Sequence, residues 1–298
     1  SCTFINTPSK GQVQVNKKVD LDGNGTYEGG NSEAQANGMF WKLDGGSNTT
    51  FGGTQSNVAT GSHQVTETMP ANYHFTGWYN SSNQQQSCAN PAGTTLPVNV
   101  TVNSNLTTNI TLCNARNTGT IKVKKTVINN NGGQLTPSTF TMNVTGEGLD
   151  VAGSPVAGSA AGTSFNLKTG TYTVSENTVA GYAQTSLVCV DQANSQVVAN
   201  PVVLQKDQNV VCTITNDDIA PTVTIVKNVV NPFGTPLPAS AFGLFVDGQI
   251  VYSGIPTTEF DAGSHVVSEE QEPGYELSSI SGDCERDGDF ANLMLSLG

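Results

Sequence analysis

A run of oxygen-bearing side chains at alternating positions is the clearest metal-ligand pattern in this sequence. Its members are Asp20, Asp22, Asn24, Thr26 and Glu28. Calcium-binding loops place oxygen ligands at this spacing around a glycine at position six, and Gly25 stands there. The pattern therefore predicts a Ca²⁺ site in this loop, with an acidic, glycine-rich turn as the alternative.

Position twelve of the same loop departs from the calcium pattern. It holds Asn31, where such loops use a bidentate glutamate. Either Glu28 or Glu33 would then have to complete the ligand shell, and we expect no helices beside the loop.

The six cysteines are the second group with chemical potential. No two form a C-x-x-C pair, and none of the three histidines, His63, His74 and His265, stands near a cysteine. These spacings exclude the usual zinc and thioredoxin-like patterns. We therefore expect disulfides, and with them an oxidising, extracellular environment.

One pattern of strands occurs three times along the chain and positions the remaining polar residues. Its first strand alternates apolar residues and ends in lysine, an apolar strand running into glycine follows, and a later strand ends in glutamate. Because side chains alternate between the two faces of a strand, each lysine and glutamate shares a face with the apolar residues. These residues are Lys17, Lys125 and Lys227 on the first strand and Glu67, Glu176 and Glu269 on the later strand.

A closing strand of the form Cys-x-x-x-Asn ends the first two copies of the repeat. It contains Cys113 and Asn117 in the first copy, and Cys212 and Asn216 in the second. Each copy has one earlier cysteine at the matching repeat position. The repeat therefore predicts the disulfides Cys88–Cys113 and Cys189–Cys212.

The third copy contains an earlier cysteine, Cys284, but no closing strand before Gly298. Residues 1–6 repeat the closing strand of the second copy, with Cys2, Phe4 and Asn6 matching Cys212, Ile214 and Asn216. An open sheet edge is an aggregation hazard that a donated strand removes. We expect residues 1–10 to be donated to a neighbouring copy, with Cys2, Phe4 and Asn6 at the interface and Cys2 bonded to Cys284.

Composition agrees with an all-β chain that binds neither nucleic acid nor membranes. The 298 residues include 32 Gly and 13 Pro, only 12% are charged, and the net charge is -12. No apolar run is long enough to span a bilayer, and the start at Ser1 resembles a processed, mature form. Neither G-x-S-x-G nor H-E-x-x-H occurs, so we expect no enzyme.

The stretch Thr169–Glu176 and the ending Cys212–Asn216 resemble Cna protein B-type, SpaA-like prealbumin-fold domains of bacterial pilins and surface stalks. The resemblance implies tandem Ig-like β-sandwiches, here at residues 11–117, 118–217 and 218–298, the third completed by the donor strand at residues 1–10. It also implies isopeptide bonds between lysine and asparagine, assisted by a glutamate. The implied sets are Lys17, Glu67 and Asn117; Lys125, Glu176 and Asn216; and Lys227, Glu269 and Asn6 of a neighbour.

Two alternatives accompany these expectations. Each lysine could instead extend to solvent and pair with its glutamate while the asparagine caps a turn. The whole chain is expected to be an extracellular filament subunit that polymerises head to tail with copies of itself. The alternative is one segment of a longer repetitive adhesin or stalk.

Overall fold

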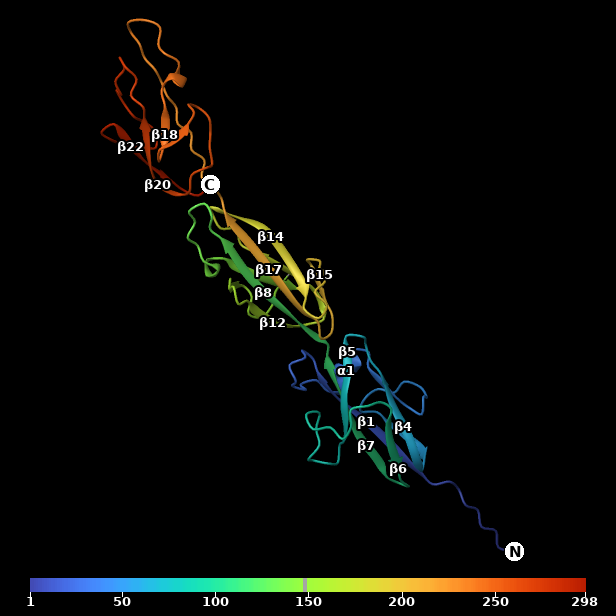
Figure 1. The fold of residues 1–298 in the computed structure, drawn as a ribbon. Coiled ribbons are helices and arrows are strands. Elements are labelled where there is room, and N and C mark those ends of the chain that lie inside the picture. The colour runs from blue at the N-terminus through green and yellow to red at the C-terminus, as the bar shows by residue number, and fades with distance from the viewer. Residues whose placement is uncertain (147–148) are drawn as a thin grey trace. The chain divides into compact units, whose positions relative to one another are not determined.

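The computed structural model describes residues 1–146 and 149–298, and strands make up nearly all of its regular structure (Figure 1). The prediction of an all-β fold is confirmed. Helices are limited to α1 (Asn31–Ala36) and two short 3₁₀ turns, η1 (Pro137–Thr139) and η2 (Ala239–Ala241), within the described residues. None of these helices has the length and apolar character needed to cross a membrane.

The chain divides into two compact units. The first contains Ser1–Ile121, Phe165–Thr171 and Val203–Asn209, and the second contains the remaining described residues. The sheets divide differently, because each draws its strands from residues 10–116, 118–218 or 244–295 alone. The organisation into three domains therefore stays a prediction.

Residues 10–116 form two facing sheets. One has the order β3-β1-β7-β5 and the other the order β2-β4-β6. Val13, Val15 and Trp41 are among the fully buried residues of the core. The strands are β1 (Lys10–Asp20), β2 (Phe40–Leu43), β3 (Thr54–Ala59), β4 (Gly61–Thr68), β5 (Tyr73–Asn80), β6 (Val98–Val102) and β7 (Thr107–Arg116).

Residues 118–218 form two five-stranded sheets. Their orders are β12-β8-β17-β14-β15 and β10-β9-β13-β16, with β11 paired to β9. The strands are β8 (Thr118–Ile128), β9 (Thr141–Gly146), β10 (Leu149–Asp150), β11 (Val156–Ala157), β12 (Thr163–Lys168), β13 (Gly170–Glu176), β14 (Tyr182–Asp191), β15 (Val197–Val198), β16 (Val202–Leu204) and β17 (Asn209–Asp218).

Residues 244–295 form one five-stranded sheet of order β19-β18-β20-β22-β21. The strands are β18 (Leu244–Val246), β19 (Gln249–Val251), β20 (Gly263–Glu269), β21 (Cys284–Asp287) and β22 (Phe290–Leu295). The expected strand from Val223 to Lys227 is not formed. Only an isolated bridge between Val223 and Thr257 occurs there.

The last strand of each complete sandwich lies in the middle of its sheet. This position explains why the strand expected at residues 223–227 of the third copy is not formed. β7 lies between β1 and β5, parallel to β1 and antiparallel to β5, and β17 lies between β8 and β14. A central strand supplies backbone partners to both neighbours. In the third copy, the described residues contain no strand equivalent to β7 or β17. Residues 222–230 and 275–283, which such a strand would join, therefore form no ladder.

Candidate functional site

A buried lysine joins the two sheets of the first sandwich. Lys17 on β1 is 2% exposed, and its Nζ donates hydrogen bonds to Glu67 on β4 and, at 2.6 Å, to the Oδ1 of Asn114 on β7. Asn114 is fully buried, with its Nδ2 3.1 Å from the Met69 sulfur. The arrangement places an amine, a carboxyl group and a carboxamide together in the core.

Asn117, the asparagine expected beside Lys17, lies elsewhere. Its Oδ1 is 2.8 Å from His74 Nδ1, and its Nδ2 donates to the backbone oxygen of Ala71 at 2.8 Å. It therefore holds a turn, and the expected set Lys17, Glu67 and Asn117 is corrected to Lys17, Glu67 and Asn114.

Strand register gives the reason for this correction. Asn114 pairs with Phe75, two residues after Tyr73, and Asn216 pairs with Gln184, two residues after Tyr182. Both β5 and β14 then contain a bulge, so Asn114 and Asn216 are structurally equivalent. Cys113 directly precedes Asn114, whereas Cys212 is four residues before Asn216. Aligning the two copies on their cysteines therefore matches Asn216 with Asn117 instead of Asn114.

Burial sets the protonation of this first site. Desolvation lowers the pKa of Lys17 to about 8, although Glu67 opposes the shift, and desolvation also raises the pKa of Glu67. Both shifts favour neutral groups. A neutral amine is a nucleophile and a protonated carboxyl group can donate a proton, so the site has the components of an amide exchange.

The second sandwich contains the equivalent site. Lys125 on β8 is completely buried, and its Nζ lies 2.7 Å from Glu176 Oε2. Burial lowers the pKa of Lys125. Asn216 is buried on β17, and its Oδ1 accepts no hydrogen bond from any described residue. Of the expected set, Lys125 and Asn216 thus lie on the neighbouring strands β8 and β17, and Glu176 lies on β13 of the other sheet of the same sandwich.

The third copy has the same pair but lacks the asparagine. Lys227 Nζ lies 2.7 Å from Glu269 Oε2, and the lysine side chain is 14% exposed. Within the described chain, Lys227 makes no hydrogen bond to an asparagine. Asn6, which was expected to serve here, lies in the N-terminal tail.

Each lysine also lies over a phenylalanine ring, a feature that the sequence analysis missed. Lys17 is 4.9 Å from the Phe51 ring centre, Lys125 is 4.2 Å from Phe140, and Lys227 is 4.3 Å from Phe242. Phe140 and Phe242 stand just before β9 and β18 at equivalent repeat positions, which was the available signal. Phe51 instead comes from a turn that no alignment connects to them. The rings exclude water from one side of each amine.

An open groove adjoins the pair in the third copy. It has a volume of about 740 Å³, and residues 221–230 and 275–284 both line it. Lys227, Glu269, Cys284, Leu293 and Leu295 contribute to its walls. The groove therefore lies between the two segments that would flank a central closing strand.

The N-terminal tail has the opposite character. Residues 1–9 belong to no strand, and Phe4 is 92% exposed. Figure 1 shows this tail running away from the strands of the first unit. Cys2 is exposed, the Cys284 thiol is half-buried, and neither forms a disulfide within the chain.

Both intrachain disulfides are formed, but not at equivalent positions. Cys189 and Cys212 are direct cross-strand partners on β14 and β17, with a Cα–Cα distance of 3.9 Å. Cys113 instead faces Gly77, and Cys88 reaches it from the loop after β5 at a Cα–Cα distance of 5.6 Å. The expectation that both bonds occupy one repeat position was wrong, because Cys113 stands one residue before Asn114 whereas Cys212 stands four residues before the equivalent Asn216.

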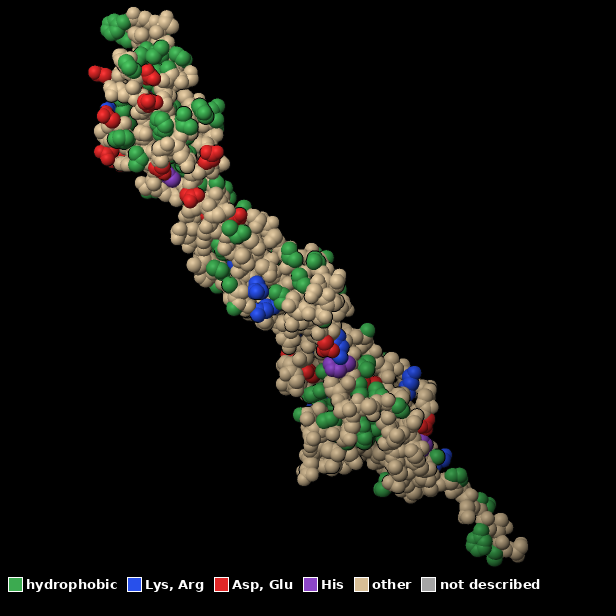
Figure 2. All heavy atoms as spheres, viewed as in Figure 1, with side chains coloured by type: hydrophobic (Ala, Val, Ile, Leu, Met, Phe, Trp, Pro, Cys, Tyr) green, Lys and Arg blue, Asp and Glu red, His purple; other side chains and the backbone are tan. Residues whose placement is uncertain are grey.

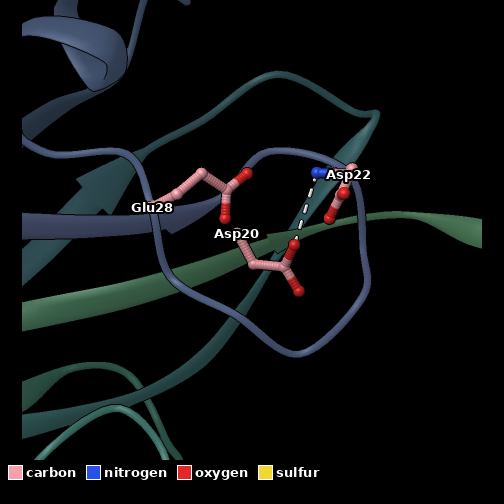
Figure 3. A group of neighbouring side chains, drawn as sticks. All are labelled: Asp20, Asp22 and Glu28. Atoms are coloured by element: carbon pink, nitrogen blue, oxygen red, sulfur yellow. Dashed lines mark hydrogen bonds between the residues drawn. The ribbon is translucent and has the colours of Figure 1, made fainter.

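The candidate calcium loop closes between β1 and residue 29. Val19 and Gly29 exchange backbone hydrogen bonds across its base. Ligand atoms of Asp20, Asp22 and Glu28 all lie within 4.8 Å of one another (Figure 3). The Asp20 carboxylate also accepts backbone hydrogen bonds from residues 23–25, which folds the loop around it.

The neighbouring residues show which side chain completes the acidic cluster. The Oδ1 of Asn31 accepts a hydrogen bond from the Lys17 backbone, and the Glu33 carboxylate accepts one from the Gly30 backbone at the start of α1. Both are therefore engaged elsewhere, and Glu28 joins Asp20 and Asp22. The expectation that no helix adjoins the loop was wrong, since α1 follows it directly.

Two histidine–aspartate pairs occur at equivalent places. His63 Nδ1 lies 2.6 Å from Asp44 and its Nε2 2.8 Å from the Ala59 carbonyl oxygen. His265 Nδ1 lies 2.7 Å from Asp247, and its Nε2 contacts the Asp261 carbonyl oxygen at 2.8 Å. Two acceptors facing one ring favour the doubly protonated imidazole.

The pKa values of both histidines are raised. Hydrogen bonding to Asp44 is the main cause for His63. Burial opposes the charge on His265, but the hydrogen bonds to Asp247 and to the Asp261 carbonyl raise its pKa. A raised histidine pKa adds stability that is complete below the unfolded pKa of about 6.5 and is lost as pH rises through the folded pKa.

We therefore expect stability to fall as pH rises from about 6.5, the unfolded value, through the raised folded pKa values of the two histidines. The aspartates are about half exposed, so each pair should contribute less than about 1 kcal/mol. Melting temperatures at low salt should decrease over this range in the parent and change less in a His63→Asn, His265→Asn variant. Equal pH dependence in the two proteins would contradict the assignment.

Comparison with known proteins agrees with this geometry. Residues 116–214 match the family model SpaA_2, described as a prealbumin-like fold domain. No curated protein sequence is similar enough to count as a relative.

Among solved structures, the Bacillus anthracis TIE protein has a TM-score of 0.51 at 15% identity; the match covers 97% of this chain but about half (49%) of that protein. The Streptococcus pyogenes major pilin has a TM-score of 0.31 at 15% identity, covering 72% of this chain and 99% of the pilin. BcpA, the major pilin subunit of Bacillus cereus, has a TM-score of 0.35 at 11% identity, covering 97% of this chain and 96% of the pilin. The match to the family model shows a prealbumin-like fold at residues 116–214.

Proposed function

We propose that this chain is a structural segment of an extracellular filament or stalk, held together by strand donation into the groove of the third copy. The observation that supports this most strongly is the groove itself, which lies where β7 and β17 lie in the complete sandwiches. The tail at residues 1–8 is the occupant that we propose, contributed by a second copy of the chain.

Sequence and chemistry of the tail support its choice as occupant. In the second sandwich, Cys212, Ile214 and Asn216 point inward from β17. The matching tail residues are Cys2, Phe4 and Asn6. Inserted in the same register, they would place Phe4 in the apolar interior and Asn6 towards Lys227 and Glu269.

The register of the second sandwich also predicts the new cross-strand pairs. Asn216 lies opposite Gln184, two residues after Tyr182, and Ile214 opposite Leu187. Counting from Tyr275 in the same way, Asn6 should face Leu277 and Phe4 should face Ile280. The same count places Cys2 opposite Gly282, two residues before Cys284, and a disulfide between the two cysteines would make separation of the copies depend on reduction.

We also propose isopeptide bonds at the buried lysines. The neutral Lys17 amine attacks the Asn114 side-chain carbonyl carbon, Glu67 passes a proton to the departing nitrogen, and one ammonia leaves as one amide forms. The same step joins Lys125 to Asn216. In the third copy the bond would join Lys227 to Asn6 of the donor, with Glu269 as the proton carrier.

The test of strand donation is assembly of the chain in solution. The parent should form head-to-tail oligomers, whereas a variant lacking residues 1–8 should stay monomeric under the same conditions. A Cys2→Ser variant should still assemble, but without a reducible link. Light scattering and non-reducing gels measure both effects, and normal oligomers of the shortened chain would exclude donation by this tail.

The alternative assembly is a long repetitive polypeptide in which the preceding segment of the same chain donates the strand. Native material distinguishes the two cases. Mass measurement of tryptic peptides that span residue 1 would show a longer continuous polypeptide, whereas Ser1 as a free amino terminus would favour separate subunits.

We propose further that the loop at residues 20–28 binds Ca²⁺. Its carboxylates match the hard oxygen ligands that Ca²⁺ prefers, and Asn24 Oδ1 and the Thr26 carbonyl group lie in the same loop. Bound Ca²⁺ would neutralise neighbouring carboxylates and tie the end of β1 to residue 29.

Calcium at one hundred times its dissociation constant should stabilise the folded chain by about 2.7 kcal/mol. The expected result is a higher melting temperature that chelation reverses. Asp22→Ala should remove the response, and Asp283→Ala, which changes an exposed acid outside the loop, should preserve it. An unchanged response in Asp22→Ala would contradict the site.

A further inference from the structure

A pocket in the first sandwich belongs to neither the lysine sites nor the groove. It has a volume of about 390 Å³ and lies between the end of β5, residues 81–97 and strands β6 and β7. All the residues that line it are uncharged, although the chain has a net charge of -12. Those used below are Trp78, Asn80, Asn83, Gln86 and Asn99.

The amide oxygens of the pocket hold its own loop together. Gln86 Oε1 accepts a hydrogen bond from the Asn80 backbone, Asn80 Oδ1 accepts one from Ser82, and Asn83 Oδ1 accepts one from Gln85. These contacts fix which end of each amide faces the backbone. The three NH₂ groups are left without a hydrogen bond to any described residue.

Asn99, on β6, adds a free amide oxygen to the free NH₂ groups of the pocket. Neither its amide oxygen nor its nitrogen hydrogen-bonds within the described part of the chain, and the side chain is exposed on β6. The pocket therefore offers several NH₂ donors and the Asn99 carbonyl oxygen as an acceptor beside an indole.

The loop that forms one wall is fixed by covalent and backbone bonds. The Cys88–Cys113 disulfide ties it to β7. The Trp78 backbone donates to the Gly93 carbonyl at 2.9 Å and accepts from Ala92 at 2.7 Å. A wall that is ordered before binding reduces the entropy lost when a ligand binds.

We propose that this pocket binds a neutral saccharide. Sugar hydroxyl groups both donate and accept, so they match NH₂ groups and the Asn99 carbonyl oxygen, and an apolar sugar face can pack on the indole. The pocket volume is in the range of small-ligand sites. A nucleotide or an acidic sugar would find no cation among the lining residues.

The experiment uses the isotope-labelled full chain and NMR titration. The probes are glucose, galactose, mannose and N-acetylglucosamine, with glucuronate as the charged counterpart. At least one neutral sugar should shift the Trp78 indole signal and the Asn and Gln side-chain signals of the pocket, saturating in the millimolar range. Glucuronate should shift them at least about tenfold more weakly.

Asn99→Ala should weaken binding of the active sugar about tenfold, since it removes hydrogen bonds without breaking any within the chain. The remaining spectrum should be unchanged, which reports an intact fold. Asn48→Ala, which alters an exposed asparagine outside the pocket, should bind like the parent. The proposal is overturned if no neutral sugar shifts the pocket signals, if glucuronate shifts them equally, or if Asn99→Ala binds like the parent.

Discussion

A synthetic peptide of residues 1–10, added to a variant that lacks residues 1–8, is expected to order the third copy of the repeat. Residues 222–230 and 275–283 have no ladder partner within the described chain. An inserted strand would pair with both segments at once. Hydrogen exchange should therefore slow in both segments when the peptide is added.

The expected gain in stability has two sources. Backbone groups on both sides of the groove become paired, and Phe4 moves from nearly full exposure into the interior, which contributes about 1.5–3 kcal/mol. At a peptide concentration of one hundred times the dissociation constant, the third copy should be stabilised by about 2.7 kcal/mol. Calorimetry would measure this as a shift of its melting transition.

A peptide with Phe4→Ser is the matched control, because it keeps the backbone and loses the apolar anchor. It should protect the same segments much more weakly. Insertion into the groove would be refuted if the parent peptide slowed hydrogen exchange only in β1 and β7. It would also be refuted if the peptide slowed exchange nowhere. Such a result would also remove the main support for a filament or stalk.

The sequence was sufficient to predict most strands, because their alternation reflects a buried and an exposed face. β1, β9 and β13 are examples, and the side chains of Lys17 on β1 and Glu176 on β13 are buried on the apolar faces as expected. The strand expected at residues 223–227 shows the limit of this reasoning. Alternation says which face a segment would bury, but a ladder also needs a partner, which the described chain does not provide.

Asn114 could not be predicted from repeat spacing. The cysteine stands one residue before the equivalent asparagine in the first copy and four residues before it in the second, so aligning the copies on cysteine pointed to Asn117. The presence of Glu28 in the acidic cluster, instead of Glu33, could not be predicted from the sequence either. It depends on α1, a six-residue helix whose start uses the Glu33 carboxylate and which is too short to give a periodic pattern.

The correction from Asn117 to Asn114 leads to the second large expected effect, a covalent bond that a single substitution should abolish. The reduced full chain should be lighter than its sequence mass by about 17 Da for each amide formed, because each bond releases one ammonia. Two bonds are expected in the monomer, Lys17–Asn114 and Lys125–Asn216. Asn114→Ala should restore one ammonia mass, after allowing for the substitution itself.

Stability should change in parallel with mass. Lys17 and Asn114 are 97 residues apart, and a link closing a loop of that length removes unfolded-state entropy worth roughly 4–5 kcal/mol, as it does for a disulfide. Loss of the bond should therefore lower the melting temperature of the first sandwich by more than about 10 °C. Glu67→Gln should also prevent bond formation, because it removes the proton carrier while keeping the shape of the site.

Two matched controls separate loss of the bond from general damage. Asn117→Ala alters the asparagine that binds His74 and Ala71, so it should destabilise the local turn but preserve the mass deficit. Lys18→Ala removes the adjacent, exposed lysine and should preserve both the deficit and the melting temperature. A deficit that persists in Asn114→Ala and disappears in Asn117→Ala would overturn the assignment. A parent chain at its full sequence mass would show that Lys17 and Glu67 are only a buried pair.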